Sequence, residues 1–260
     1  MKPKELRELI KSGKFARSTA GVCPGYVQTN LIVLEKEYAD DFEEFCRLNQ
    51  KAVPLLEVVR DGHKSSLLAN GADLLDELPM YNIIKDGQVV EQRKDIRDIY
   101  KKNLVFFLIG CSFTFENSLL EAGIKLRHIE NCQNVSMYDT NIELTPYGVF
   151  KGNMVVSMRP VKKDQVALAY KVTSCYPKMH GEPIHKGDFK AIGIKDINSP
   201  EYGERVEIKD DEVPLFWPCG VTPQSVLKEI KIPFAITHTP GHMFVTDKKD
   251  SEYYTEDIVR

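Results

Sequence analysis

Two segments of the chain share the order of buried strand, glycine-containing turn and short helix, and this order most constrains the fold. Leu104–Ile109 is apolar without alternation, as expected of a strand covered on both faces, and it runs into Gly110–Asn117 and a helix. Val213–Trp217 is followed by the turn Cys219–Thr222 and by a helix with Pro223 at its first position. Because strand–turn–helix units are typical of parallel pairing with helices on both faces, we predict an α/β lobe with a mainly parallel sheet.

Ligands bind parallel sheets at the carboxyl ends of the strands. Gly110–Glu116 and Cys219–Thr222 are turns at such ends. His238–His242 is a third, because it follows the apolar strand Pro233–Thr237. We therefore expect the three turns to converge on one crevice.

The chain between the two units has a different texture. Residues 149–159 and 191–197 are predicted as strands, 163–173 as a helix, and 175–188 as a polar turn. We interpret residues 126–212 as a smaller α+β lobe inserted into the first lobe, which then comprises residues 1–125 and 213–260.

Composition excludes several classes of partner. With 260 residues and a net charge of −3, the chain gives no electrostatic reason to expect a nucleic acid or an anionic membrane. The N-terminus lacks the apolar stretch of a signal peptide, and the six cysteines form no C-x-x-C pair. These features predict reduced thiols and a cytoplasmic protein that binds a small molecule, and they leave a homo-oligomer open.

Common cofactor motifs are absent from the sequence. There is no phosphate loop, no G-x-G-x-x-G fingerprint and no H-E-x-x-H. No cofactor is predicted, therefore, and an ATP-driven ligase or a nicotinamide dehydrogenase is unsupported. A divalent metal stays open, because five side chains could ligate one although their spacing matches no standard site: His180, His185, Asp188, His238 and His242.

The candidate acid and base residues lie in polar loops. His180, His185 and Asp188 occur within nine residues, and His238 and His242 frame a Pro-Gly bend. Histidine is the side chain best suited to exchange protons near neutral pH. The alternative is that these are solvated turns whose histidines serve structure.

The turn after the first buried strand has its own chemistry. Backbone N–H groups at the start of a helix favour an anion, so a substrate carboxylate could bind beside Cys111 and Ser112. Glu116 could act as a base, or it could simply complement the helix dipole. Cys111 is not an expected nucleophile, because burial would keep its pKa high.

Further candidate binding residues lie in two other segments. Tyr26, Gln28 and Asn30 in the N-terminal loop could orient a ligand, and Cys219 and Thr222 border the second glycine turn.

Taken together, the polar segments resemble a known family, that of the hydro-lyases related to D-glutamate cyclase. The segments that carry the resemblance occur in the family's order: Gly25–Asn30, Gly110–Glu116, Val155–Pro160, His180–Asp188, Pro214–Pro223 and Ile236–Met243. The resemblance implies a three-layer α/β lobe with a smaller two-layer lobe, and loss of water from a small acid. Two positions depart from the family pattern, because Asp139 and Cys175 stand where arginines are expected.

In the cyclase reaction that the resemblance implies, the α-amine of D-glutamate attacks its own side-chain carboxyl and gives 5-oxo-D-proline. On this hypothesis His180, His185 and His238 exchange protons and Asp188 orients one imidazole, while Ser112 and Arg159 hold carboxylates. The same groups would serve an α,β-elimination of water from a hydroxy acid. A module that binds an amino acid or acyl ligand without turnover is a third interpretation.

Overall fold

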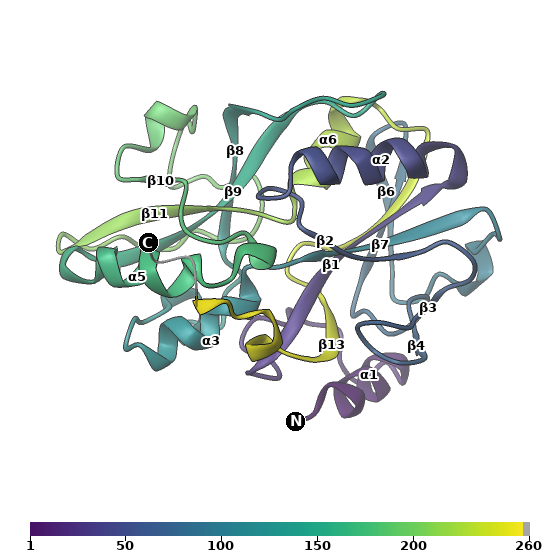
Figure 1. Cartoon of the computed structure of the whole chain (residues 1–260), viewed down its shortest axis with the longest axis horizontal. Coiled ribbons are helices and arrows are strands. Elements are labelled where there is room, and N and C mark those ends of the chain that lie inside the picture. The colour runs from purple at the N-terminus through teal and green to yellow at the C-terminus, as the bar shows by residue number, and fades with distance from the viewer. Residues whose placement is uncertain (257–260) are drawn as a thin grey trace.

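The computed structural model describes residues 1–256 and contains two main sheets joined by helices (Figure 1). The larger sheet has the order β2 (Leu55–Val59), β7 (Leu104–Gly110), β1 (Tyr26–Glu35), β12 (Phe234–His238), β5 (Tyr81–Lys85) and β6 (Gln88–Arg93), and β13 (Phe244–Lys249) also pairs with β1. The smaller sheet has the order β10 (His185–Lys186), β11 (Glu212–Pro218), β9 (Asn153–Lys162) and β8 (Ser136–Glu143). Strands β3 (Lys64–Ser65) and β4 (Ala72–Asp73) form a separate pair.

The helices are short and pack on these sheets. The α-helices are α1 (Pro3–Lys11), α2 (Lys36–Leu48), α3 (Phe113–Glu121), α4 (Arg127–Glu130), α5 (Val166–Ser174) and α6 (Thr222–Glu229). The 3₁₀ turns are η1 (Arg97–Ile99), η2 (Lys163–Gln165), η3 (Pro177–Met179), η4 (Phe189–Ile192) and η5 (Asp250–Tyr253). In Figure 1, α2 and α6 lie above the larger sheet, and the smaller sheet lies to the left with α5 beside it.

Alternation along β1 explains how the larger sheet is covered. Ile32 and Leu34 belong to a core shared with α2 and α6, whereas Leu31 and Val33 belong to a core shared with the segment 68–78. Both faces of the strand are therefore buried, and a continuous apolar sequence is the expected consequence.

The α/β class is confirmed, but the expected parallel pairing is not, because the strand pairs described are antiparallel. The physical reason is that the helix in each of the two strand–turn–helix units connects two different sheets. After β7, α3 leads to β8 in the smaller sheet, and after β11, α6 leads back to β12 in the larger sheet. Neither unit therefore returns to a neighbouring strand, as a parallel crossover must.

The division into lobes stays a prediction, and one strand lies elsewhere than expected. Strand β11, which we expected in the lobe with residues 213–260, pairs with β9 in the smaller sheet. The last four residues of that range lie outside the described residues.

Strands β12 and β13 lie end to end along one edge of β1. Ile32 to Leu34 pair with β12, and Gln28 and Thr29 pair with β13. The loop 239–243 leaves the edge between them. The backbone of β1 therefore loses its strand partner on this side near residues 30 and 31, beside the candidate site.

Candidate functional site

Two of the predicted turns meet on Asn30 in β1. The amide Nδ2 of Asn30 donates to the carbonyl of Gly110 at 2.8 Å. A Cβ on Gly220 would collide with the side chain of Asn30, so the turn after β11 packs directly against it. The convergence arises because β7 and β12 are each antiparallel to β1, which lies between them, and so run in the same direction.

The third turn joins through His238, whose ring is completely buried. Its Nδ1 accepts the backbone N–H of Leu31 at 3.2 Å, in the gap between β12 and β13. Burial lowers the pKa of His238 to about 4, although the carbonyl of Leu31, 3.3 Å from Nδ1, opposes the shift and nearby His242 adds to it. The ring is therefore neutral at neutral pH, and its contacts are those of a structural histidine at a strand junction.

The centre of the candidate site is Arg159 on β9, which is completely buried. Its Nη2 donates to Glu116 Oε1 at 2.6 Å and to Ser112 Oγ at 3.0 Å. Its Nε donates to the same oxygen of Glu116 at 3.0 Å, and its Nη1 donates to Ser157 Oγ at 3.0 Å. Four donor contacts of the guanidinium are thus used inside the protein, of the five N–H groups that an arginine has.

Glu116 is buried and has a second partner, His128, whose Nε2 donates to Oε1 at 2.9 Å. Burial by itself would raise the pKa of Glu116, but the charges and hydrogen bonds of His128 and Arg159 outweigh it and lower the pKa. The carboxylate is therefore ionised at neutral pH. Its other oxygen, Oε2, is buried and accepts no hydrogen bond.

Two members of this network, Ser157 and His128, were not among the residues predicted from the sequence. Ser157 could have been found, because it lies two residues from Arg159 on a strand and so shares its face. His128 carries no such signal, since it belongs to the four-residue helix α4 with no glycine or proline turn beside it. Only the packing of α4 on α3 brings its ring to Glu116.

His180 lies near the network but is sealed in packing. Its Nδ1 donates to the carbonyl of Lys51 at 3.0 Å, and its Nε2 is buried without a hydrogen-bond partner. Burial lowers its pKa to about 4, opposed by the carbonyls of Lys51 and Gly110 and assisted by Arg159. The residue has φ of 79°, a conformation that costs about 1–2 kcal/mol for residues other than glycine.

His185 and Asp188 are not part of this cluster. His185 pairs with Phe216, which pairs with Met158, so strand alternation places His185 on the opposite face of the smaller sheet from Arg159. Its Nε2 donates to the backbone carbonyl of Asp188 at 2.6 Å. The Asp188 carboxylate instead accepts the backbone N–H of Lys190 and caps η4, so the expected orientation of an imidazole by this carboxylate is not present.

His242 lies apart from His180, at the wall of another cavity. Its Nδ1 donates to the carbonyl of Pro240 at 3.2 Å, and burial lowers its pKa. The cavity has a volume of about 460 Å³ and is also lined by Arg17 and His128. His242 and His128 thus share a cavity, although His242 makes no contact with the Glu116 network.

The two turn cysteines pack together in an apolar cluster. Burial raises the pKa of the Cys111 thiol, and it raises the pKa of the Cys219 thiol to about 11. Neither is a thiolate at neutral pH, in line with the expectation for Cys111. The Thr222 hydroxyl donates to the carbonyl of Cys219 at 2.6 Å and accepts the N–H of Val155, which is a structural role.

Tyr26 and Glu116 meet at a cavity of about 230 Å³. It lies between the glycine loop at residues 21–26 and helix α3, and Gln28 and Thr114 also line it. Pockets for drug-sized ligands measure about 300–1,000 Å³, so this volume suits a small metabolite. Of the predicted acid and base residues, Glu116 lines this cavity and the histidines do not.

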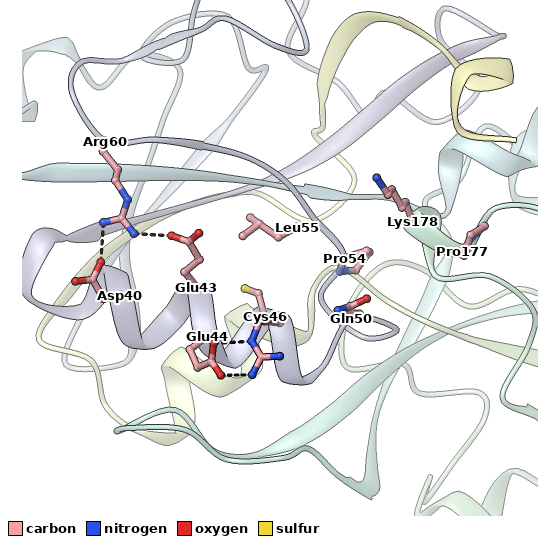
Figure 2. Close-up of a pocket in the computed structure, with 11 residues that line it drawn as sticks. Asp40, Glu43, Glu44, Cys46, Gln50, Pro54, Leu55, Arg60, Pro177 and Lys178 are labelled. Atoms are coloured by element: carbon pink, nitrogen blue, oxygen red, sulfur yellow. Dashed lines mark hydrogen bonds and ion pairs between the residues drawn. The ribbon is translucent and has the colours of Figure 1, made fainter. Parts of the chain in front are cut away.

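A larger cavity of about 690 Å³ lies elsewhere, between α2 and the segment at Pro177–Lys178 (Figure 2). Most of its charges are already paired, because Arg60 bonds Asp40 and Glu43 and because Arg47 bonds Glu44 (Figure 2). None of the predicted site residues lines it. Size alone therefore does not identify the site.

The two departures from the family pattern lie outside the Arg159 network. Asp139 on β8 accepts a hydrogen bond from the Ser225 hydroxyl at 3.2 Å. Cys175 is buried after α5, and its thiol donates to the carbonyl of Lys171. Each side chain is accommodated by neighbours of its own.

Within residues 1–256, no three histidine, cysteine or acidic side chains are grouped so that they could hold a metal ion. In the same range, no helix has the length and apolar character needed to span a bilayer.

Comparison with known proteins identifies the family. A family model described as D-glutamate cyclase matches residues 105–247. A protein named "Putative hydro-lyase" from Clostridium beijerinckii is 49% identical over 251 residues, which cover 96% of each chain. A "Putative hydro-lyase" from a Thermoanaerobacter species is 51% identical over 96% of this chain and 95% of its own.

A solved structure also aligns, that of a nitrogen repressor-like protein from Methanococcus jannaschii. It covers 96% of this chain and 99% of its own, with 11% identity and a TM-score of 0.39. The family model and the close relatives, by contrast, extend over the turns and strands that build the Arg159 network. The chain belongs to the D-glutamate cyclase family, and about half of its residues are identical to those of these hydro-lyase relatives.

Proposed function

We propose that the protein removes water from a small amino acid, and that its reaction is the closure of D-glutamate to 5-oxo-D-proline. Membership of the D-glutamate cyclase family supports the reaction class. The observation that carries the proposal is the state of Glu116. It is an ionised carboxylate at the wall of a metabolite-sized cavity, held from behind by Arg159 and His128.

The chemistry assigns a role to each part of this arrangement. Ring closure forms a carbon–nitrogen bond and breaks a carbon–oxygen bond. The ammonium loses two protons, and the departing carboxyl oxygen gains two and leaves as water. An ionised carboxylate beside the ammonium can accept the first proton. The N–H of His128, which donates to Oε1, stabilises the charged form of Glu116 before that transfer.

The same arrangement changes the roles expected for Ser112 and Arg159. Because the Arg159 guanidinium already bonds Glu116, Ser112 and Ser157, it is not free to grip a substrate carboxylate with two N–H groups. In the proposed function Arg159 and Ser112 position Glu116. The substrate's carboxylates would meet other parts of the cavity wall, to which Tyr26 and Asn117 contribute.

Two other functions use the same cavity. An α,β-elimination of water from a hydroxy acid also needs a base beside the substrate. A binding module would hold an amino acid or acyl ligand without turnover. An ionised Glu116 is compatible with each of these functions, so they are separated by the products that the protein forms.

The test is incubation of the purified protein with D-glutamate, L-glutamate, 5-oxo-D-proline and a set of hydroxy acids, followed by mass detection of products. We expect water to be lost from D-glutamate. Loss of water from a hydroxy acid alone would replace ring closure with elimination, and ligand binding without any product would replace an enzyme with a binding module.

A further inference from the structure

The cavity beside Glu116 is lined by few charged side chains. Its walls come from the glycine loop, from Gln28, from α3 and from Ile129. Among these residues Glu116 is the single charged side chain of the Asp, Glu, Lys and Arg types. A ligand group in this cavity therefore meets one carboxylate and no lysine or arginine.

Two residues that line this cavity each keep one oxygen that accepts no hydrogen bond. The oxygens are Oε1 of Gln28 and Oε2 of Glu116, and both are buried. Gln28 is 3% exposed and Glu116 is 2% exposed. Buried acceptors without a donor cost free energy, and most native proteins keep few of them.

Neither side chain can find a donor for its unpaired oxygen by rotating its terminal amide or carboxylate group. The Nε2 of Gln28 donates to the carbonyls of Thr19 and Val22 at 3.0 and 3.1 Å, so a flipped amide would set its oxygen against two other acceptors. The other oxygen of Glu116 is held by Arg159 and His128. The cavity is therefore lined by two residues whose unpaired acceptor oxygens are fixed in place and need two hydrogens.

We infer that Gln28 and Glu116 bind the ammonium group of an amino acid, and that Gln28 is a specificity-determining residue that rejects hydroxy acids. An ammonium carries three N–H donors and can satisfy both oxygens at once, whereas a hydroxyl carries one donor and leaves one oxygen unpaired. Sites built to hydrogen-bond a substrate group discriminate strongly against an analogue that lacks it. This inference rests on the proposed function for the location of the substrate, and it adds the residue that selects between amino and hydroxy acids.

The test measures binding rather than turnover. Calorimetry compares D-glutamate with D-2-hydroxyglutarate, which has a hydroxyl in place of the amine, and with glutarate, which has neither. We expect D-glutamate to bind about tenfold or more tightly than either analogue, because each analogue leaves a buried acceptor unpaired. Equal affinities, or no binding of any of the three, would overturn the inference.

A variant assigns the preference to Gln28. Gln28→Met removes the acceptor oxygen at similar side-chain volume, and we expect the preference for the amine to shrink at least about threefold in this variant. Gln50→Met is the matched control, because Gln50 lines the larger cavity and should leave the preference unchanged. Thermal unfolding checks that both variants are folded. The comparison of ligands on the unaltered protein decides the inference even if Gln28→Met does not fold.

The two proposals fail in different ways. Preferential binding of D-glutamate without any loss of water would retain the amine selectivity and remove the proposed reaction. If the protein bound D-glutamate and D-2-hydroxyglutarate with similar affinity and removed water from both, it would still be a hydro-lyase, but Gln28 would not select the amine.

Discussion

Arg159 and Glu116 form an ion pair in the interior, with Nη2 of the arginine 2.6 Å from Oε1 of the glutamate and both side chains almost without exposure. One partner comes from the smaller sheet and the other from the helix that follows β7. The pair therefore joins the two sheets as well as setting the ionisation of Glu116.

Removing one partner of this pair should destabilise the protein strongly. We expect Arg159→Met to lower the free energy of unfolding by about 3–5 kcal/mol, because it leaves a buried carboxylate without its main partner. Lys248→Ala, which breaks the exposed pair with Glu252, should cost less than about 1 kcal/mol. Urea denaturation measures both. In the double variant Glu116→Gln/Arg159→Met the loss should be smaller than the sum of the two single losses, and simple additivity would contradict this account.

His128 should act on the reaction through the pKa of Glu116. Because His128 helps to lower that pKa, His128→Asn should raise it and move the acidic limb of the pH dependence of kcat to higher pH. The measurement is kcat for loss of water from D-glutamate across the acidic range. His63→Asn is the control, because that imidazole pairs with Asp73 in the hairpin of β3 and β4. If His128 served only to stabilise the fold, His128→Asn would lower kcat without shifting the acidic limb of its pH dependence.

Stability should fall as the pH drops below neutral. His180 and His238 have folded-state pKa values of about 4 against 6.5 in an unfolded chain, so the unfolded state binds their protons first. Their contribution is complete above pH 6.5 and is lost as the pH falls towards about 4. Each histidine should contribute a slope of about 1.4 kcal/mol per pH unit within that window.

Single variants separate the two histidines in this experiment. His238→Gln should show a shallower slope, since an amide oxygen can still accept the N–H of Leu31 but does not titrate in this range. His180→Asn should do the same, because asparagine tolerates the left-handed conformation. Urea unfolding at several pH values gives the slopes. A stability that does not change over the window would show that these rings are not buried and neutral.

Alanine substitutions at Gly110 and Gly220, where the turns converge, should both lower stability, but a second substitution should restore stability only for Gly220. A Cβ on Gly220 would strike the side chain of Asn30, so Gly220→Ala should cost about 1–3 kcal/mol and Asn30→Ala in the same chain should recover part of it. A Cβ on Gly110 would strike the backbone carbonyl of Lys178. Lys178→Ala should therefore give no recovery. Thermal and urea unfolding test both pairs, and rescue of Gly110→Ala by Lys178→Ala would refute the packing described.

The site was predictable where chemistry is encoded locally. The turn after β7 contains Ser112 and Glu116, and both belong to the buried network, as does Arg159. Histidine-rich loops were a poorer guide. His185 turns to the other face of its sheet, and His238 fills the junction between β12 and β13. Nothing in a local pattern distinguishes an imidazole that reacts from one that completes a backbone hydrogen bond.

By itself, the sequence determined the buried strand Leu104–Gly110, the turn and helix that follow it, and the family to which the chain belongs, because unbroken hydrophobicity and local turn residues act over short distances. Only the tertiary structure decided strand direction, since α3 and α6 cross between sheets instead of returning to a neighbour. It also decided that His128 reaches Glu116 and that one oxygen each of Gln28 and Glu116 stays without a donor. Those outcomes depend on which surfaces pack together over long separations along the chain, and such packing follows from the sum of many contacts rather than from any single motif.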